Sequence, residues 1–267
     1  MQAPSSDLIV SLGEAVRDAA RRAGALAFPY FRAGGKTAAR LWYKEHSSPV
    51  TEADIALDAF LKDQLSRLLP EAGWLSEETI DDPVRLERSR IWIVDPIDGT
   101  RAFATGHPDW SISIALVENG RPVLGVIHAP IHDRMYEAVL GRGARCNGES
   151  LRASEAEALK SARVAGPKPL MDRLERHISP IERLPKVPSL ALRLARVAEG
   201  SIDIGLVSSN AQDWDIAAAD LILHEAGARL TDFTGTAPAY NKPLPSHGEM
   251  IAVASRLHPR AIGAMRT

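Results

Sequence analysis

The sequence predicts an α/β (α+β) fold, and three observations support that class. Apolar residues recur at helical spacing over residues 6–28, near the N-terminus. Alternating apolar residues at 110–117 run into Asn119-Gly120 and are followed by a second apolar stretch at 121–130, the pattern of a β-hairpin. Beyond about residue 160, short apolar runs alternate with helical patterns, which is typical of an α/β layer.

Composition narrows the class of protein. The chain has 267 residues, of which 45% are hydrophobic and 25% charged, as in ordinary globular proteins. A net charge of −2 gives no basic field for a nucleic acid polymer or an anionic membrane. Cys146 is the only cysteine, which excludes an internal disulfide and a cysteine-based metal site. No apolar run is long enough to span a membrane, and the N-terminus lacks the basic region of a signal peptide, so we expect a cytoplasmic protein.

The elements of the first part follow from local signals. The first helix should end at Pro29, and a second should begin after Thr51 and end at Pro70. Thr51 followed three residues later by Asp54 resembles a capping box. A strand at 91–94, the hairpin and a further strand at 134–141 complete this part. Residues 1–150 are therefore expected to form helices followed by a mostly antiparallel sheet.

The second part alternates between strands and helices. Strands are predicted at 161–166, 201–207 and 250–255, and another directly after Gly227. The helices are predicted at 189–199, stopped by Gly200, and at 213–226. The segment between residues 148 and 160 is polar. We therefore divide the chain into 1–150, with most of the acids discussed below, and 151–267, an α/β part.

Five acids stand where predicted elements begin or end: Asp54, Glu77, Asp95, Asp98 and Asp215. Each has an ordinary interpretation alone, as a helix-capping residue, a turn residue or a solvated loop acid. Together they form a set of oxygen ligands suited to a hard cation such as Mg²⁺, which keeps waters for a phosphate. The combination favours metal-assisted hydrolysis of a phosphate ester.

Other motifs fit less well. The acids lack the spacing of an EF-hand, and the histidines form no H-E-x-x-H pair. Residues 34–37, GGKT, lack the earlier glycine and the strand of a P-loop. The motif DPIDGT at 95–100 is one residue longer than the D-x-D-G-T loop of haloacid-dehalogenase-like phosphatases, and it does not open the chain.

The segments WIVDPIDGTRAF and DWDIAAADLILHEAG, with SSPVTEAD and WLSEE in the same order, resemble the inositol monophosphatase family of Mg²⁺-dependent, lithium-sensitive phosphomonoesterases. The resemblance covers roughly residues 45–255. It implies a layered α-β-α-β-α sandwich with the active site between the two parts. It also implies a small phosphorylated metabolite as substrate, and a homodimer is the family-level expectation. A non-catalytic binding protein is the least favoured alternative.

The resemblance assigns the metal ligands. Glu77, Asp95 and the carbonyl of Ile97 would bind a first Mg²⁺. Asp95, Asp98 and Asp215 would bind a second, so Asp95 would bridge the two ions. A third, weaker ion would face Glu77 through waters.

The resemblance also assigns the groups that act on water and phosphate. Asp54 and Thr100, with Glu77 beside them, would orient and deprotonate the attacking water. The N–H groups of Gly99 and Thr100 would hold the phosphate, and Asp98 would border the substrate.

The residues expected to contact the substrate differ from those of inositol-specific enzymes. Many inositol enzymes carry DGTTNF, whereas Arg101 follows the threonine here, as in 3′(2′),5′-bisphosphate nucleotidase and histidinol-phosphatase relatives. Arg101 would suit a second phosphate on the substrate, and a surface charge is the alternative. Asp203 matches only loosely the acid that holds inositol hydroxyls. No base-stacking aromatic is evident near the motifs, since Phe103 suits the core equally well, which slightly favours sugar- or polyol-phosphates.

Overall fold

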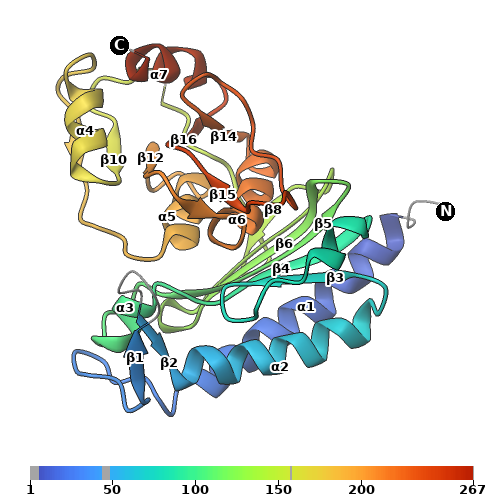
Figure 1. Ribbon diagram of the computed structural model, residues 1–267. Helices are drawn as coiled ribbons and strands as arrows, with labels where there is room; N and C mark the ends of the chain where they lie inside the picture. Colours follow the sequence, from blue (N-terminus) through green and yellow to red (C-terminus); the bar gives the residue numbers. More distant parts are fainter. Residues whose placement is uncertain (1–5, 44–48, 157, 267) are drawn as a thin grey trace.

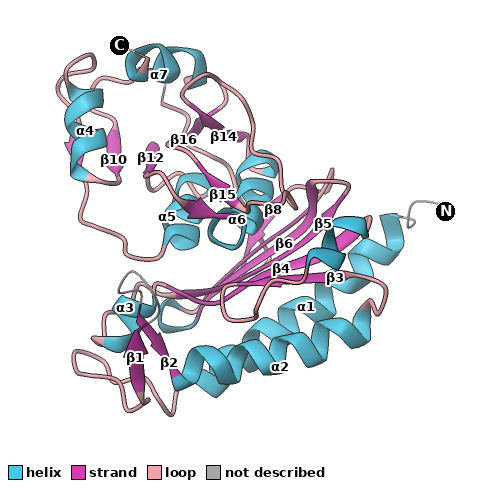
Figure 2. Cartoon of the chain, viewed as in Figure 1, coloured by secondary structure: helices cyan, strands magenta, loops and turns pink. Residues whose placement is uncertain are grey.

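The computed structural model describes residues 6–43, 49–156 and 158–266. Its secondary structure forms five layers in the order α-β-α-β-α, as the two ribbon views show (Figures 1 and 2). The predicted fold class and layering are confirmed. The layers are important for function because the acids of the sequence motifs lie in different layers.

The first layer holds two long helices. α1 spans Ser6–Ala27 and α2 spans Glu52–Leu68, both close to the predicted bounds. The predicted capping box at the start of α2 is present: Asp54 N–H donates to Thr51 Oγ1 at 3.4 Å, and Thr51 N–H donates to Asp54 Oδ2 at 2.8 Å. A small antiparallel pair, β1 (Leu41–Tyr43) and β2 (Pro49–Thr51), leads into α2.

The second layer is a seven-stranded sheet with the order β3-β4-β5-β6-β7-β8-β9. Its strands are β3 (Gly73–Ser76), β4 (Arg90–Asp98), β5 (Ser111–Glu118), β6 (Arg121–Ala129), β7 (Arg134–Val139), β8 (Ala144–Cys146) and β9 (Glu149–Ser150). Only the β3–β4 pair is parallel among these neighbours, so the mostly antiparallel prediction is confirmed. In the predicted hairpin turn, Asn119 and Gly120 have φ angles of 50° and 78°, as a tight β-turn between twisted strands requires.

One strand is longer than predicted. β4 continues through Asp98, whereas the sequence favoured an end at residue 94. Asp95 pairs with Ser113 and Asp98 with Ser111, and the register shifts between them. Pro96 lies in this irregular stretch, where a residue without a backbone N–H is tolerated. The two acids therefore belong to the end of a strand rather than to a loop after it.

The third layer contains α5 (Leu190–Ala198) and α6 (Asp213–Glu225). Both follow the prediction, and Gly200 and Gly227 end them with φ angles of 77° and 86°. The fourth layer is a five-stranded sheet with the order β11-β10-β12-β16-β14. Its strands are β10 (Arg163–Ala165), β11 (Glu182–Arg183), β12 (Ile204–Val207), β14 (Ala228–Asp232) and β16 (Met250–Ala254).

The remaining elements are short. The outer layer consists of α4 (Lys168–Glu175) and α7 (His258–Met265). α3 (Thr100–Ala104) follows β4, and β13 (Ala211–Gln212) pairs with β15 (Ser246–His247) before α6. Two 3₁₀ turns span Pro83–Glu87 and Pro130–His132. These elements lack a clear sequence signal, because segments of eight residues or fewer show little periodicity.

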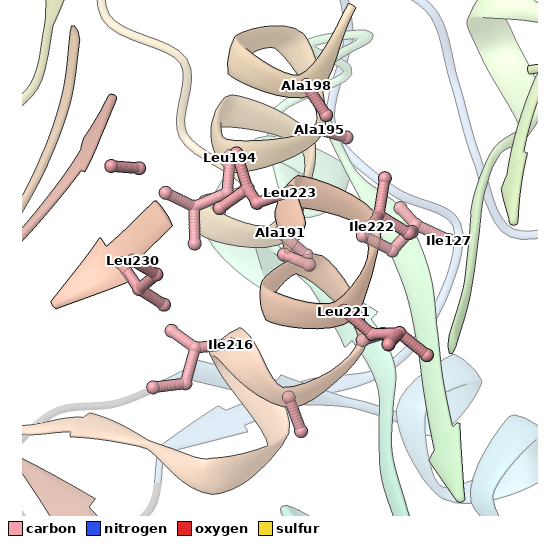
Figure 3. Close-up of a cluster of buried hydrophobic side chains, with 14 of the residues drawn as sticks. Ile127, Ala191, Leu194, Ala195, Ala198, Ile216, Leu221, Ile222, Leu223 and Leu230 are labelled. Carbon is pink, nitrogen blue, oxygen red and sulfur yellow. The ribbon is translucent and has the colours of Figure 1, made fainter. Parts of the chain in front are cut away.

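Buried apolar clusters separate the layers. One joins α1 and α2 to a face of the seven-stranded sheet, through side chains such as Leu61 and Trp92. The central cluster joins the opposite face to α5 and α6, and Figure 3 shows Ile127 of β6 beside Ile222 of α6. The outer cluster joins the five-stranded sheet to α4 and α7. Each sheet is thus covered by helices on both faces.

α6 lies close to the first sheet at Gly125 of β6. A Cβ added there would lie 2.7 Å from the carbonyl oxygen of Ala218 in α6. Glycine is needed at this position because the obstacle is helix backbone, which cannot rotate away. The contact sets how α6, and therefore Asp215 in its first turn, lies against the strands that carry the other acids.

We predict that Gly125→Ala lowers the free energy of unfolding by about 1–3 kcal/mol, the usual range for overpacking. Gly263→Ala is the control, because the added Cβ in α7 would meet nothing within 4 Å. That change should stabilise the helix by up to about 1 kcal/mol. Denaturant unfolding of both variants measures the difference, and a stable Gly125→Ala protein would contradict the close approach.

Candidate active site

Most of the predicted site residues come together in one hollow of about 260 Å³. Its wall is formed by Pro49, Glu77, Asp95, Asp98, Gly99, Thr100, Arg101, Lys186, Pro188 and Asp215. These residues come from β2, the end of β3, β4, α3, the segment before α5, and α6. The site therefore lies where the first sheet meets the helices of the middle layer, close to α3 in Figure 1.

Three carboxylates form the centre of the hollow. Asp95, Asp98 and Asp215 each offer an oxygen, and these oxygens lie within 4.8 Å of one another. Burial raises the pKa of Asp95 well above its ordinary value, and the charges of Glu77, Asp98 and Asp215 raise it further. Burial and the charge of Asp98 likewise raise the pKa of Asp215. Buried like charges at this spacing are costly, so the cluster fits a bound cation, which would relieve the repulsion.

Asp98 is also bound to the start of α5. The N–H groups of Ala191 and Leu190 donate to its carboxylate at 2.7 and 3.1 Å, and the hydroxyl of Ser189 donates to Oδ2. Ser189 caps α5, because its Oγ accepts from Leu192 N–H at 3.0 Å. These donors offset part of the effect of burial on the pKa of Asp98. Sequence reasoning missed Ser189, whose only local signal is its position before a helix.

Asp54 and Thr100 form a buried pair beside the cluster. Thr100 Oγ1 lies 3.0 Å from Asp54 Oδ1 and 3.1 Å from the carbonyl oxygen of Ile97, and its single proton can be donated to only one of them at a time. Thr51 holds the other Asp54 oxygen through its N–H and hydroxyl groups. Burial raises the pKa of Asp54 to about 6, which brings a carboxylate toward the range of a general base.

Gly99 makes the turn between β4 and α3. Its φ of 94° is left-handed, and a Cβ would lie 3.2–3.3 Å from backbone atoms of Asp109 and Ser189. Glycine suits both requirements. The turn places Thr100 at the start of α3, next to the strand that carries Asp95 and Asp98.

The remaining predicted residues differ in their placement. Glu77 and Arg101 border the hollow, although Glu77 is not part of the close carboxylate trio. Asp203 requires a correction, because the structure does not bring it to the hollow. Its two oxygens accept hydrogen bonds from the backbone and the guanidinium of Arg163 on the neighbouring strand, at 2.8–3.0 Å. Asp203 thus links the start of β12 to the neighbouring strand β10 in the second sheet. Lys186 borders the site, although the sequence did not predict it.

An α-β-α-β-α sandwich with a buried carboxylate cluster beside a Thr–Asp pair defines a hydrolase of the metal-dependent phosphatase class. The sequence model of the inositol monophosphatase family matches residues 11–267. The chain belongs to the inositol monophosphatase family.

Individual relatives agree with that assignment. The chain is 38% identical over 72% of its length to a Thermotoga maritima fructose-1,6-bisphosphatase/inositol-1-monophosphatase, 75% of which is covered. It is 32% identical over 72% of its length to the Escherichia coli 3′(2′),5′-bisphosphate nucleotidase CysQ, with 79% covered. The solved structure of a Thermotoga maritima IMPase aligns with a TM-score of 0.81 at 29% identity, covering 94% of this chain and 95% of that one.

These findings establish the enzyme class. The chain is a phosphoric monoester hydrolase that acts on small phosphate esters, in a family that depends on metal ions. Among the described helices, none combines the length and apolar character needed to cross a bilayer.

We predict that Ser189→Ala lowers the free energy of unfolding by about 1–3 kcal/mol, because it removes a helix cap and leaves a buried carboxylate with one donor fewer. Ser201→Ala removes an exposed hydroxyl that lies 2.7 Å from Glu199 Oε1 and 3.2 Å from Arg196 O, and it should change stability by less than about 0.5 kcal/mol. Chemical denaturation compares the two, and equal stabilities would show that the Ser189–Asp98 link contributes nothing.

Proposed function

We propose that the protein hydrolyses a small phosphate monoester with the aid of two or three Mg²⁺ ions. The buried trio of Asp95, Asp98 and Asp215 is the observation that carries the proposal. Its donors are all carboxylate oxygens, which suit Mg²⁺ better than softer metals. Asp95, Glu77 and the Ile97 carbonyl would complete a second ligand set. Bound Mg²⁺ would neutralise phosphoryl oxygens and lower the pKa of a bound water.

Side chains of the protein would then accept the proton of the attacking water. Thr100 Oγ1 is positioned to accept a hydrogen bond from the attacking water while its own proton points to Asp54 Oδ1. Asp54 would take up that proton, and its raised pKa supports a role as base. Thr51 keeps the carboxylate in place from the opposite side. The N–H groups of Gly99 and Thr100 would hold the phosphate next to this pair.

The natural substrate belongs to the proposal as well. Hydrolysis of an inositol monophosphate-like ester is the leading function. The alternative substrates are 3′(2′),5′-bisphosphate nucleotides and histidinol phosphate. A panel of these three esters, assayed for phosphate release with and without Mg²⁺, tests the proposal. Absence of Mg²⁺-dependent turnover on every ester would favour a non-catalytic binding protein, which the full set of acids argues against. A homodimer, expected from the family resemblance, and a cytoplasmic location, expected from the sequence features, belong to the same proposal.

We predict that Asp95→Asn lowers kcat/KM by about 100-fold or more, above the 10–100-fold typical of residues that only support a metal ligand. One amide would replace the anion shared by both ligand sets. The same change should abolish the rise in Tm that Mg²⁺ gives the wild type. Asp203→Asn is the control, because Asp203 pairs with Arg163 away from the hollow. Similar activities of the two variants at saturating Mg²⁺ would contradict a bridging role for Asp95.

Lithium inhibition is the second prediction from this site. Li⁺ is small and takes oxygen ligands, and it would replace the ion held by Asp95, Asp98 and Asp215 after the ester is cleaved. Inhibition should then be uncompetitive or mixed with respect to substrate, which initial-rate measurements at several Li⁺ concentrations determine. Purely competitive inhibition would argue against this placement.

A further inference from the structure

Asp58 is a buried carboxylate that does not line the hollow of the candidate site. It lies in α2, four residues after Asp54, and is 7% exposed. Because residues four apart share one face of a helix, both acids lie on the buried face of α2, which packs on the first sheet. An apolar side chain would fill such a position without the cost of burying a charge. The presence of a carboxylate there requires an explanation.

The partners of Asp58 are two hydroxyl groups, one on each side of Glu77 in the sequence. Ser76 Oγ donates to Asp58 Oδ1, and Thr79 Oγ1 donates to Asp58 Oδ2 at 2.6 Å. Ser76 is the last residue of β3, and Glu77 follows it directly. One carboxylate of α2 therefore holds segment 76–79 by a residue before Glu77 and by a residue after it.

Further hydrogen bonds fix the direction of both hydroxyl protons. Trp74 Nε1–H donates to Thr79 Oγ1 at 3.1 Å, and the N–H group of Glu78 donates to Ser76 Oγ at 3.4 Å. A hydroxyl group has one proton, and an ionised carboxylate can only accept. Each hydroxyl thus accepts one hydrogen bond and gives its own proton to Asp58. The two side chains therefore hold segment 76–79 in one defined arrangement.

The other side of segment 76–79 is bound to the first sheet. β3 and β4 run parallel, with Ser76 opposite Val94, and the N–H group of Glu77 donates to the carbonyl oxygen of Val94 at 3.4 Å. The residue after Val94 is Asp95. The main chain therefore joins the segment to β4, and Asp58 joins it to α2. These two attachments determine where Glu77 lies relative to Asp95.

We propose, building on the phosphatase function proposed above, that Asp58 is a positioning residue that holds Glu77 in the place where it shares the first Mg²⁺ with Asp95. α2 then contributes two acids with separate roles, since Asp54 accepts a proton and Asp58 orients a metal ligand. Thr51 holds Asp54 through hydrogen bonds that do not involve Asp58. Loss of Asp58 should therefore affect metal binding before it affects proton transfer.

Calorimetry of Mg²⁺ binding to the protein without substrate tests the proposal. Asp58→Ala should weaken Mg²⁺ binding about 10- to 100-fold, the range typical of residues that support a metal ligand. Asp203→Ala is the matched control, because Asp203 is also buried and hydrogen-bonded, but its partner Arg163 lies outside the hollow. The control should lower Tm and leave the affinity for Mg²⁺ unchanged. Wild-type affinity in Asp58→Ala, or an equal loss in both variants, would overturn the proposal.

A pair of changes at Thr79 keeps the test decisive if Asp58→Ala does not fold. Thr79→Val keeps the shape of the side chain and removes the hydroxyl donor, so it should weaken Mg²⁺ binding by part of the effect of Asp58→Ala. Thr79→Ser retains the hydroxyl group and should bind Mg²⁺ like wild type. Equal affinities of the valine and serine variants would contradict the role of this hydrogen bond and overturn the proposal.

A double-mutant cycle with Glu77→Gln tests whether Asp58 acts through Glu77. If it does, adding Asp58→Ala to Glu77→Gln should weaken Mg²⁺ binding by no more than about twofold, whereas independent effects would multiply. A further loss as large as that caused by Asp58→Ala alone would show that Asp58 acts elsewhere, and it would overturn the proposal.

The binding measurement separates failure of this inference from failure of the proposed function. If wild type binds Mg²⁺ but releases phosphate from no ester, the proposed function is wrong, and the Asp58 and Thr79 variants still decide the inference. If wild type binds no Mg²⁺, Glu77 has no ion to share and the inference is overturned. In an active enzyme, Asp58→Ala should raise the Mg²⁺ concentration for half-maximal activity by more than it lowers kcat at saturating Mg²⁺. The opposite pattern would contradict a role in placing a metal ligand.

Discussion

The arrangement of the site depends on the hydrogen bonds between the Asp98 carboxylate and the start of α5. Asp98 closes β4 in the first sheet, and its partners Ser189, Leu190 and Ala191 begin a helix of the middle layer. A carboxylate at a helix N-terminus meets unpaired N–H groups and the positive end of the helix dipole. The group that joins the two layers is therefore the same group that offers an oxygen to the carboxylate cluster.

That arrangement concentrates negative charge where water is largely excluded. Asp95 and Asp98 are 2% and 5% exposed, so burial raises the pKa of both carboxyl groups, and the charges of neighbouring acids raise that of Asp95 further. The positive groups lie around the cluster rather than inside it: Arg193 is a buried residue of α5, and Lys186 and Arg101 lie on the wall of the hollow. Such a separation leaves the centre available for a cation and the surroundings available for an anionic substrate.

Local signals explain what could be predicted from the sequence. The capping box of Thr51, the hairpin turn at Asn119-Gly120 and the glycines after α5 and α6 each act within a few residues, so the pattern alone identified them. The five acids are recognisable because they stand where predicted elements begin or end, and the family resemblance supplies their expected roles. What the sequence could not supply were partners far along the chain. Ser189 reaches Asp98 across 91 residues, and nothing near position 189 indicates that contact.

The errors have a similar origin. β4 extends beyond its predicted end because a register shift between Asp95 and Asp98 accommodates Pro96. The loose match of Asp203 to the acid that holds inositol hydroxyls does not place it at the site, because Arg163, 40 residues earlier, binds its carboxylate. α4 and α7 are too short to show a hydrophobic period and are held by their contacts with the second sheet.

The three clustered acids belong to two layers. Asp95 and Asp98 end a strand of the first sheet, and Asp215 lies in the first turn of α6, which packs on the face of that sheet opposite to α1 and α2. A cation that all three bind would therefore hold the two layers together in addition to its role in catalysis. Any ligand that binds only the folded form adds to its stability in proportion to the logarithm of its free concentration. The thermal stability of this protein would then depend on the free concentration of that cation, and a chelator in a purification buffer would lower stability and activity together.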